Sequence, residues 1–412
     1  MLRHREAVSA AWYRAPRPVL QPGHQVVVLE TGAEFFPALE AELASASDQV
    51  FLETYIFQDD RSGRRIARAL ADAARRGVRV HLVVDGFGTG KLSGEVARLL
   101  HDSGVSIQVF RPEPKWFSFD AARLRRLHRK LAVIDGRCAF VGGINLLDDY
   151  FDPNHGVLEN PRLDFAVRVQ GPLVAQIHLI MQRLWWDLDL LGRTRVGPSG
   201  AWAQVPAPPA DFGGEPKPAG RLRAMLVLRD NFRYRRTIER IYLRGIHRCS
   251  REILIANAYF FPGVRFRRAL LAAAARGVKV TLLLQGRVEY RLQHYASQAL
   301  YDELLLGGIE IVEYQKSFLH AKVAVIDDWA TVGSSNIDPF SLLLAREANV
   351  VVSNHDFAAD LRGRLQRAIA DGGTPIALHH HERRPWPVRV MNWFAYLVLR
   401  AGVSLTGLAG RF

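Results

Sequence analysis

One short pattern occurs twice in this chain, and no other feature of the sequence constrains the fold as strongly. Each copy reads His-x-Lys-x4-Asp and leads, after a turn, to a glycine-containing segment that ends in Asn. The copies comprise His128, Lys130, Asp135, Gly142, Gly143 and Asn145, and His320, Lys322, Asp327, Gly333, Ser334 and Asn336. Because only seven of the 55 basic residues are Lys, chance repetition is rare. We therefore expect one site built from two halves.

Both copies lie in apolar runs that predict buried strands, residues 131–134 and 323–326. Residues two apart in a strand point to the same face, so the His and Lys of each copy can reach one phosphate group. The alternative is a pair of surface strands without a role.

The repetition extends beyond the motifs, because residues 76–80 (Arg-Gly-Val-Arg-Val) are echoed by residues 276–280 (Arg-Gly-Val-Lys-Val). An apolar helical stripe precedes each of these glycines and predicts a helix that ends there. Strands are predicted over 49–57, 81–85, 105–110, 252–261, 281–285 and 309–314, with further helices over 92–101 and 290–306. This alternation predicts an α/β fold in which two tandem α/β/α sandwich halves, related by a pseudo-twofold axis, surround mostly parallel or mixed β-sheets and share one active site.

These repeats divide the chain into five segments. We expect an N-terminal extension (1–25), a first half (26–191), a Pro- and Gly-rich linker (192–220), a second half (221–375) and a membrane-associating C-terminal tail (376–412).

Composition narrows the class of partner. The net charge of +14 predicts an anionic partner, either nucleic acid or an acidic membrane surface. Cys138 and Cys249 are too few and too separated for a zinc cluster or a disulfide framework, so we expect buried thiols. The first 25 residues contain no apolar stretch of signal-peptide length, which favours a cytoplasmic location.

The apolar segment 391–410 is the main candidate for contact with a bilayer. Asn392 and Arg400 interrupt it, so it is marginal as a spanning helix. Trp393 and Tyr396 beside several Arg residues favour a helix at the lipid headgroup boundary, with a core helix and a membrane span as alternatives.

Three other segments also have two interpretations each. The insertion 111–127 mixes basic and aromatic residues and is either a headgroup-binding flap or a solvated loop. The Arg cluster between Arg229 and Arg240 favours an ordinary charged helix face. Three adjacent His residues, 379–381, favour a solvated tail over a metal site.

Two His-Lys pairs supply what cleavage of a phosphodiester requires. One imidazole can attack phosphorus, while the other donates a proton to the departing oxygen and later takes one from the incoming hydroxyl. Lys130 and Lys322 would neutralise the phosphoryl oxygens, with hydrogen bonds from Asn145, Ser334 and Asn336. This scheme needs no metal and no cofactor.

Each imidazole also needs a partner on its second nitrogen, and a carboxylate shortly after each Asn is the natural candidate. Asp164 and Glu347 occupy matching strand contexts and are predicted to orient the two His rings. Asp135 and Asp327 lie too far along their strands to share the face of the His, so we expect them to brace the motif rather than act on substrate.

The paired motifs resemble the phospholipase D superfamily, whose members use two such halves for phosphatidyl or phosphodiester transfer. Residues 256–263, 228–231 and 329–339 are similar to bacterial cardiolipin synthases of the B type, and the resemblance runs from about residue 26 to about residue 400. It implies transfer of a phosphatidyl group from one phosphatidylglycerol to a second, with release of glycerol and formation of cardiolipin. It also implies peripheral attachment to the cytoplasmic face of the bacterial inner membrane, anionic phospholipids as partners and no nucleic acid.

By the same resemblance His128 would be the nucleophile and His320 the general acid and base, with the reverse assignment as an alternative. Gly143 departs from the Ser that is frequent in the superfamily, and the turn after Asp327 is one residue shorter than that after Asp135. The rival functions are a hydrolase or nuclease of the same superfamily and a non-catalytic basic scaffold that binds membranes.

Overall fold

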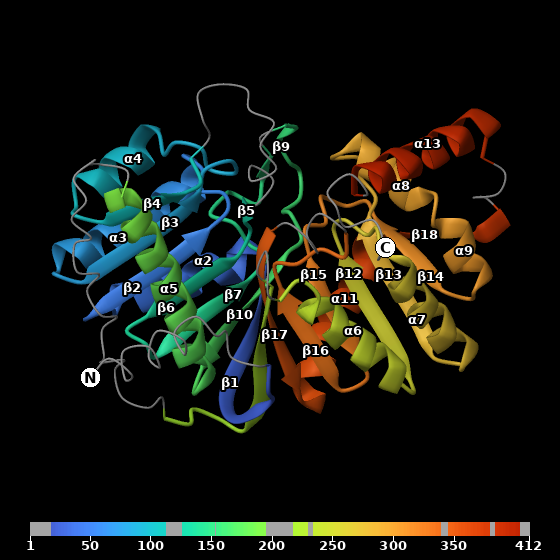
Figure 1. The fold of residues 1–412 in the computed structure, drawn as a ribbon, viewed down its shortest axis with the longest axis horizontal. Coiled ribbons are helices and arrows are strands. Elements are labelled where there is room, and N and C mark those ends of the chain that lie inside the picture. The colour runs from blue at the N-terminus through green and yellow to red at the C-terminus, as the bar shows by residue number, and fades with distance from the viewer. Residues whose placement is uncertain are drawn as a thin grey trace.

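The chain folds into two similar lobes that lie side by side (Figure 1). The structure is a computed structural model that describes residues 18–112, 126–152, 154–194, 217–229, 234–338, 345–379 and 384–403. Most of the insertion 111–127, most of the linker 192–220 and two of the three adjacent His residues lie outside this range.

The first lobe alternates strands and helices as the apolar pattern predicts. Its elements are β1 (Gln21–Glu30), α2 (Thr31–Ala44), β2 (Gln49–Thr54), α3 (Arg61–Arg75), β3 (Arg79–Asp85), α4 (Gly94–His101), β4 (Ser106–Phe110), β5 (Arg126–Leu127), β6 (Lys130–Ile134), β7 (Cys138–Gly142), β8 (Phe151–Asp152), β9 (Gly156–Val157), β10 (Phe165–Gln170) and α5 (Leu173–Thr194).

The second lobe repeats this order and adds a C-terminal helix. Its elements are β11 (Leu222–Arg229), α6 (Thr237–Arg248), β12 (Glu252–Asn257), α7 (Val264–Ala275), β13 (Lys279–Gln285), α8 (Arg291–Gln298), α9 (Tyr301–Leu306), β14 (Glu310–Tyr314), β15 (Lys322–Ile326), β16 (Trp329–Gly333), β17 (Ala345–Ser353), α11 (His355–Gly372), β18 (Gly373–Pro375) and α13 (Trp386–Val403).

A single mixed sheet runs through both lobes. Its strands follow the order β18-β14-β13-β12-β15-β16-β17-β11-β1-β10-β7-β6-β2-β3-β4, and β5 pairs with β17. On either side of the antiparallel β1–β11 junction the strands succeed one another in equivalent order. The predicted fold class is confirmed, and the two expected sheets are joined edge to edge.

Helices cover both faces of this sheet. The outer face of the first lobe packs against α2, α3 and α4 through residues such as Leu39 and Leu70, and that of the second against α6, α7 and α9 through Leu270 and Leu304. The opposite face carries α5 and α11 in one core that spans both lobes. The helices α2, α5 and α11 were not predicted from the sequence.

Several boundaries differ from those predicted. The strands that begin at Gln49 and Glu252 end at Thr54 and Asn257, before the aromatic residues included in the prediction. The helix predicted over 290–306 is interrupted between α8 and α9, where the N–H of Leu300 donates to Ser297 instead of continuing the helical pattern. Both Gly77 and Gly277 follow their helices with positive φ values of 92° and 85°, as the pattern predicted.

Candidate active site

Two matching hairpins present the motifs. In each, the motif strand (β6 or β15) is antiparallel to the next (β7 or β16), and Lys130 faces Gly142 across the first hairpin. The second turn is one residue shorter, as predicted, because Ile326 pairs with Trp329 whereas Ile134 pairs with Cys138. The shorter turn leaves the Lys end of the strand in equivalent register.

Each catalytic His candidate lies just before its strand and is held by the other lobe. The N–H of His128 donates to the carbonyl of Arg346 on β17 (3.1 Å), and the N–H of His320 donates to the carbonyl of Leu163 (2.8 Å). The short strand β5 pairs with β17 immediately before His128. Neither His is therefore positioned by its own half alone.

The predicted His-orienting carboxylates are also exchanged between the lobes. Nδ1 of His128 lies 3.0 Å from Oε1 of Glu347, and Nδ1 of His320 lies 2.7 Å from Oδ2 of Asp164. A carboxylate that accepts from Nδ1–H leaves the lone pair of the imidazole on Nε2. The structure thus brings four of the predicted site residues together in two crossed pairs.

Burial controls the protonation of these pairs. It lowers the pKa of His128, against the pull of Glu347, and burial together with Lys322 lowers the pKa of His320 well below its usual range. Burial raises the pKa of Asp164 to about 6. Although burial acts to raise it, the pKa of Glu347 is lowered by the charge of His128 and its hydrogen bond. The two imidazoles therefore face carboxylates of different acidity.

The two Lys side chains are buried and share the site. Lys130 Nζ donates to the carbonyl of His128 (2.9 Å), and Lys322 Nζ donates to that of His320 and lies 2.7 Å from its Nδ1. Burial and the neighbouring Lys322 lower the pKa of Lys130 to about 7, and burial lowers the pKa of Lys322 to about 8. Two ammonium groups that are buried close together attract an anion strongly.

The predicted phosphate ligands have further contacts. The hydroxyl of Ser334 donates to Oε2 of Glu347 (2.5 Å), and Asn145 accepts from the N–H of Ile56 (3.3 Å). Asn336 is 3% exposed and lies at the position equivalent to Asn145. The single hydroxyl proton of Ser334 therefore goes to the carboxylate that holds His128, and its donation to phosphate stays a prediction.

Gly143 has a steric reason to differ from Ser334. A Cβ atom at Gly143 would lie 2.3 Å from Oδ1 of Asp164, which is far closer than van der Waals contact. The shorter carboxylate of the first lobe thus occupies the space that a Ser would need.

The last Asp of each motif contacts backbone rather than the other site residues. Asp135 accepts from the N–H groups of Ser47, Asp48 and Gln49, and Asp327 accepts from those of residues 250–252 in the same way. Both residues have positive φ, 49° and 51°. This placement supports the predicted bracing role, since each carboxylate ties the motif hairpin to the strand beside it.

Replacing Asp135 with Ala should lower the free energy of unfolding by about 1–3 kcal/mol, because three backbone N–H groups lose their acceptor. Thermal denaturation would measure this loss. The Asp135→Asn variant retains one acceptor oxygen and should lose less stability. Full thermal stability of Asp135→Ala, together with loss of activity, would contradict the bracing role.

Sequence reasoning missed the aromatic wall beside the first motif. The ring of Tyr55 packs edge-on against His128 (4.9 Å between centroids), and Lys130 Nζ lies 5.3 Å from its centre. A buried Arg129–Glu53 ion pair lies next to it (2.9 Å), where the second lobe has Ala321 and Ala256. Tyr55 lies within the predicted strand 49–57 and just after the observed β2, but no pattern in the sequence placed it over the His.

Known proteins share the motif arrangement and the fold. The family profile described as "Cardiolipin synthase, PLD-like domain" matches residues 39–185 and 242–369. Cardiolipin synthase B of Escherichia coli (strain K12) is 36% identical over 389 residues, which cover 93% of this chain and 90% of that protein. The chain belongs to the cardiolipin synthase family of the phospholipase D superfamily. The predicted resemblance and enzyme class, a phosphatidyltransferase of this superfamily, are thereby confirmed.

A more distant relative and a solved structure agree with this assignment. The cardiolipin synthase of Geobacillus kaustophilus (strain HTA426) is 30% identical over 95% of this chain and 75% of that protein. Among solved structures, phosphatidylserine synthase of Haemophilus influenzae Rd KW20 superposes with a TM-score of 0.65 at 11% identity, covering 98% of this chain and 99% of the other. The latter likeness shows that this cardiolipin synthase family member has the same fold.

Proposed function

We propose that this enzyme transfers a phosphatidyl group from one phosphatidylglycerol to a hydroxyl of a second, through a covalent intermediate on His128. The observation that carries this proposal is the pair of crossed His–carboxylate contacts beside two buried Lys residues. The curated relatives are named for the synthesis of cardiolipin, which is consistent with this reaction.

In the first step Nε2 of His128 attacks phosphorus and the bond to the glycerol oxygen breaks. His320 enters this step as the imidazolium, which Asp164 and the anionic phosphodiester favour, and its Nε2 donates the proton that the departing oxygen takes, so glycerol leaves neutral. In the second step His320 accepts a proton from a hydroxyl of the second phosphatidylglycerol, whose oxygen displaces His128 from phosphorus. Lys130 and Lys322 neutralise the phosphoryl oxygens in both steps. The reverse assignment of the two His residues is the alternative.

The test is incubation of the full chain with phosphatidylglycerol vesicles in the presence of EDTA, with lipids and free glycerol measured by mass spectrometry. We expect cardiolipin and glycerol to appear in equal amounts, without sensitivity to the chelator. Phosphatidic acid without cardiolipin would identify a hydrolase instead. Absence of lipid turnover, together with cleavage of nucleic acid, would favour the nuclease alternative.

The activity of the enzyme should fall as the pH rises. A Lys with its pKa lowered to about 7 or 8 loses its charge as the pH rises through that value. We expect kcat/KM to fall above about pH 7, because the free enzyme then attracts the phosphodiester anion less. Bound phosphate raises the pKa of both Lys residues, so kcat should fall only at higher pH. Equal alkaline limbs in the two profiles would contradict this role of the Lys pair.

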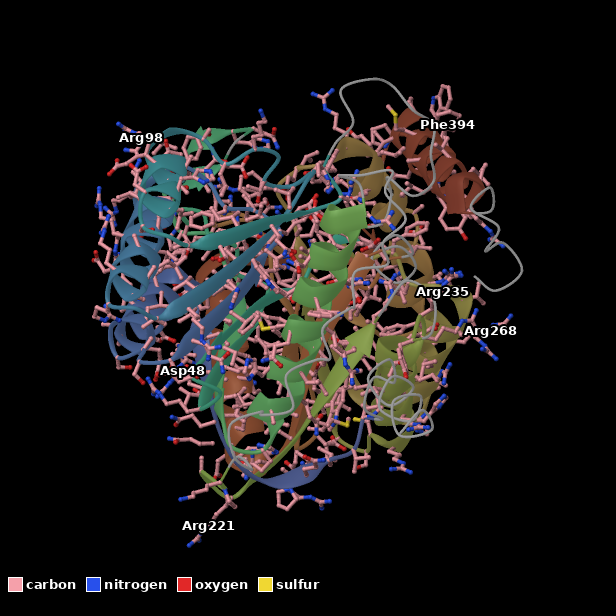
Figure 2. The ribbon with its side chains drawn as sticks, turned by 60° about the vertical axis from the view of Figure 1, so that its left-hand side comes forward. Asp48, Arg98, Arg221, Arg235, Arg268 and Phe394 are labelled. Atoms are coloured by element: carbon pink, nitrogen blue, oxygen red, sulfur yellow. The ribbon has the colours of Figure 1, made fainter. Side chains whose placement is uncertain are left out.

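The structure also supports attachment to a membrane surface through the upper edge seen in Figure 1, where β9, α8 and α13 lie. Helix α13 packs on α8 through Ala395 and Leu399 and leaves large apolar side chains exposed on its other side. Phe394, labelled in Figure 2, is one of them and is 65% exposed. No helix in the described part of the chain is long and apolar enough to cross a membrane. We propose that α13 lies in the headgroup layer of an anionic bilayer.

Replacing Trp393, Phe394 and Leu397 together with Ser should weaken binding to phosphatidylglycerol vesicles by at least about 100-fold. Each of these exposed side chains would contribute roughly 1.5–3 kcal/mol if buried in lipid. Vesicle cosedimentation measures the effect. Leu306→Ser, which removes an exposed apolar residue from α9, is the control and should bind normally. Unchanged binding by the triple variant would contradict the role of α13.

A further inference from the structure

A pocket lies beside the second motif. It is formed where β12 and β13 end, by the loop after β13 and by the start of α8, and its polar residues include Tyr259, Gln285, Glu289 and Gln293. The adjoining Ala258 donates its N–H to the carbonyl of Ala321 (2.9 Å), the residue between His320 and Lys322. The pocket thus lies directly against the second motif.

The difference between the lobes begins at one position. Glu53 faces Leu131 and Ala256 faces Val323 across equivalent strands, so Tyr55 and Ala258 occupy equivalent places two residues later. In the first lobe the Tyr55 ring packs against His128, whereas in the second lobe the small Ala258 lines the pocket.

The pocket offers both donors and acceptors of hydrogen bonds. The hydroxyl of Tyr259 donates to Oε2 of Glu289 (2.6 Å). Gln285 accepts from the N–H of Leu319 (3.0 Å), but its Nε2 is buried without a protein partner in the described part of the chain, as is Oε1 of Gln293. A buried amide without a partner costs free energy unless a ligand satisfies it.

The equivalent residue of the first lobe is fully engaged by the protein. Asp85 ends β3 as Gln285 ends β13, and its two oxygens accept from the N–H groups of Phe87, Gly88 and Leu127. Both oxygens of Asp85 thus have protein partners, whereas Nε2 of Gln285 has none in the described part of the chain. At this pair of equivalent positions, the unused hydrogen-bonding capacity therefore lies on the side of the second motif.

We infer that this pocket binds the glycerol headgroup of the phosphatidyl donor, with Gln285 donating to one hydroxyl and Glu289 accepting from another. The assignment rests on the proposed function and adds which end of the site the leaving alcohol occupies. Arg287 also lines the pocket, but its guanidinium donates to the carbonyls of Gln315 and Lys316. The carboxylate of Glu289 and the neighbouring donor and acceptor groups match a diol better than an anion. An alcohol held beside His320 receives its proton from that residue, which leaves attack from the opposite side to His128.

The experiment compares phosphatidylglycerol with phosphatidylethanol, whose headgroup has no free hydroxyl. Vesicles contain one or the other as sole phosphodiester, both reactions receive the same excess of 1-propanol as acceptor of the phosphatidyl group, and release of glycerol or ethanol is followed for the full chain. Wild-type enzyme should have a kcat/KM at least about ten-fold higher for phosphatidylglycerol. The Gln285→Leu and Tyr259→Phe variants should reduce this preference about ten-fold, chiefly through KM, because they remove contacts to the diol or to Glu289.

Tyr242→Phe is the matched control, since it removes a buried Tyr hydroxyl between Phe266 and Trp329, away from the pocket. It should leave the preference unchanged. Equal loss on both lipids in the pocket variants would indicate a structural role and overturn the inference, as would an unaltered preference. If wild-type enzyme turned over neither lipid, the proposed function itself would be wrong.

Discussion

Replacing His128 with Ala is expected to lower phosphatidyl transfer by on the order of 10⁴-fold or more, because the variant lacks the imidazole that forms the proposed covalent intermediate. Cardiolipin formation from phosphatidylglycerol vesicles measures the loss. His320→Ala should also abolish turnover, but it retains the nucleophile. Mass spectrometry of acid-quenched, digested His320→Ala protein should therefore find a phosphatidyl adduct on the peptide that contains His128.

The control for this prediction is His355→Ala. His355 also contacts a carboxylate through Nδ1, 2.9 Å from Oδ1 of Asp328, but its side chain is 66% exposed. It should retain wild-type activity. An adduct on His320 in the His128→Ala variant would support the reverse assignment, and full activity of His128→Ala would contradict the proposed chemistry altogether.

The local part of the site could be read from the sequence because its determinants are close together in the chain. A His and a Lys two residues apart before an apolar run fix a strand end and a shared direction, and the structure has both. The helix ends at Gly77 and Gly277 were predictable for the same reason, because a glycine with positive φ is a local requirement.

The crossed pairing could not be read in this way. His128 and Glu347 are 219 residues apart, and His320 and Asp164 are 156 apart, so their contacts depend on how the two lobes meet. The spacing of each carboxylate from its Asn showed that both belong to the site, but not which His each one holds. The join of β1 to β11 into one sheet sets that geometry, and no motif encodes it.

The same long-range geometry accounts for the two residues that break the repeat. Gly143 is required because the carboxylate of Asp164 lies against it, and Ala258 opens a pocket that Tyr55 closes in the other lobe. The sequence showed that Gly143 departs from the Ser frequent in the superfamily, but nothing in it singled out Ala258. Both lie on the side of His320, since Gly143 contacts its partner Asp164 and Ala258 contacts the second motif, so under the proposed mechanism a symmetric fold carries an asymmetric site.

Crossed pairing makes Asp164→Asn the most informative substitution in this asymmetric site. Because Asp164 contacts His320, the variant should lose the orientation of the proton-transferring imidazole and slow turnover by about 10² to 10⁴-fold. His128 keeps Glu347, so the covalent intermediate should still form, although slowly because His320 also protonates the departing glycerol. It should then persist, as in His320→Ala, because its breakdown requires His320 as well. Glu347→Gln should instead slow formation of the intermediate itself. Quenched-flow measurement of the adduct and of released glycerol separates the two steps.

Asp328→Asn provides the control, since it alters a carboxylate that contacts a His outside the site and should leave both steps unchanged. If Asp164→Asn prevented the adduct while Glu347→Gln let it accumulate, His320 would be the nucleophile and the roles of the two lobes would be exchanged. If both variants slowed adduct formation equally, neither carboxylate would be dedicated to one step. An active site whose halves orient each other's imidazole requires one result. The Asp164→Asn variant must behave like a His320 variant, and the Glu347→Gln variant must behave like a His128 variant.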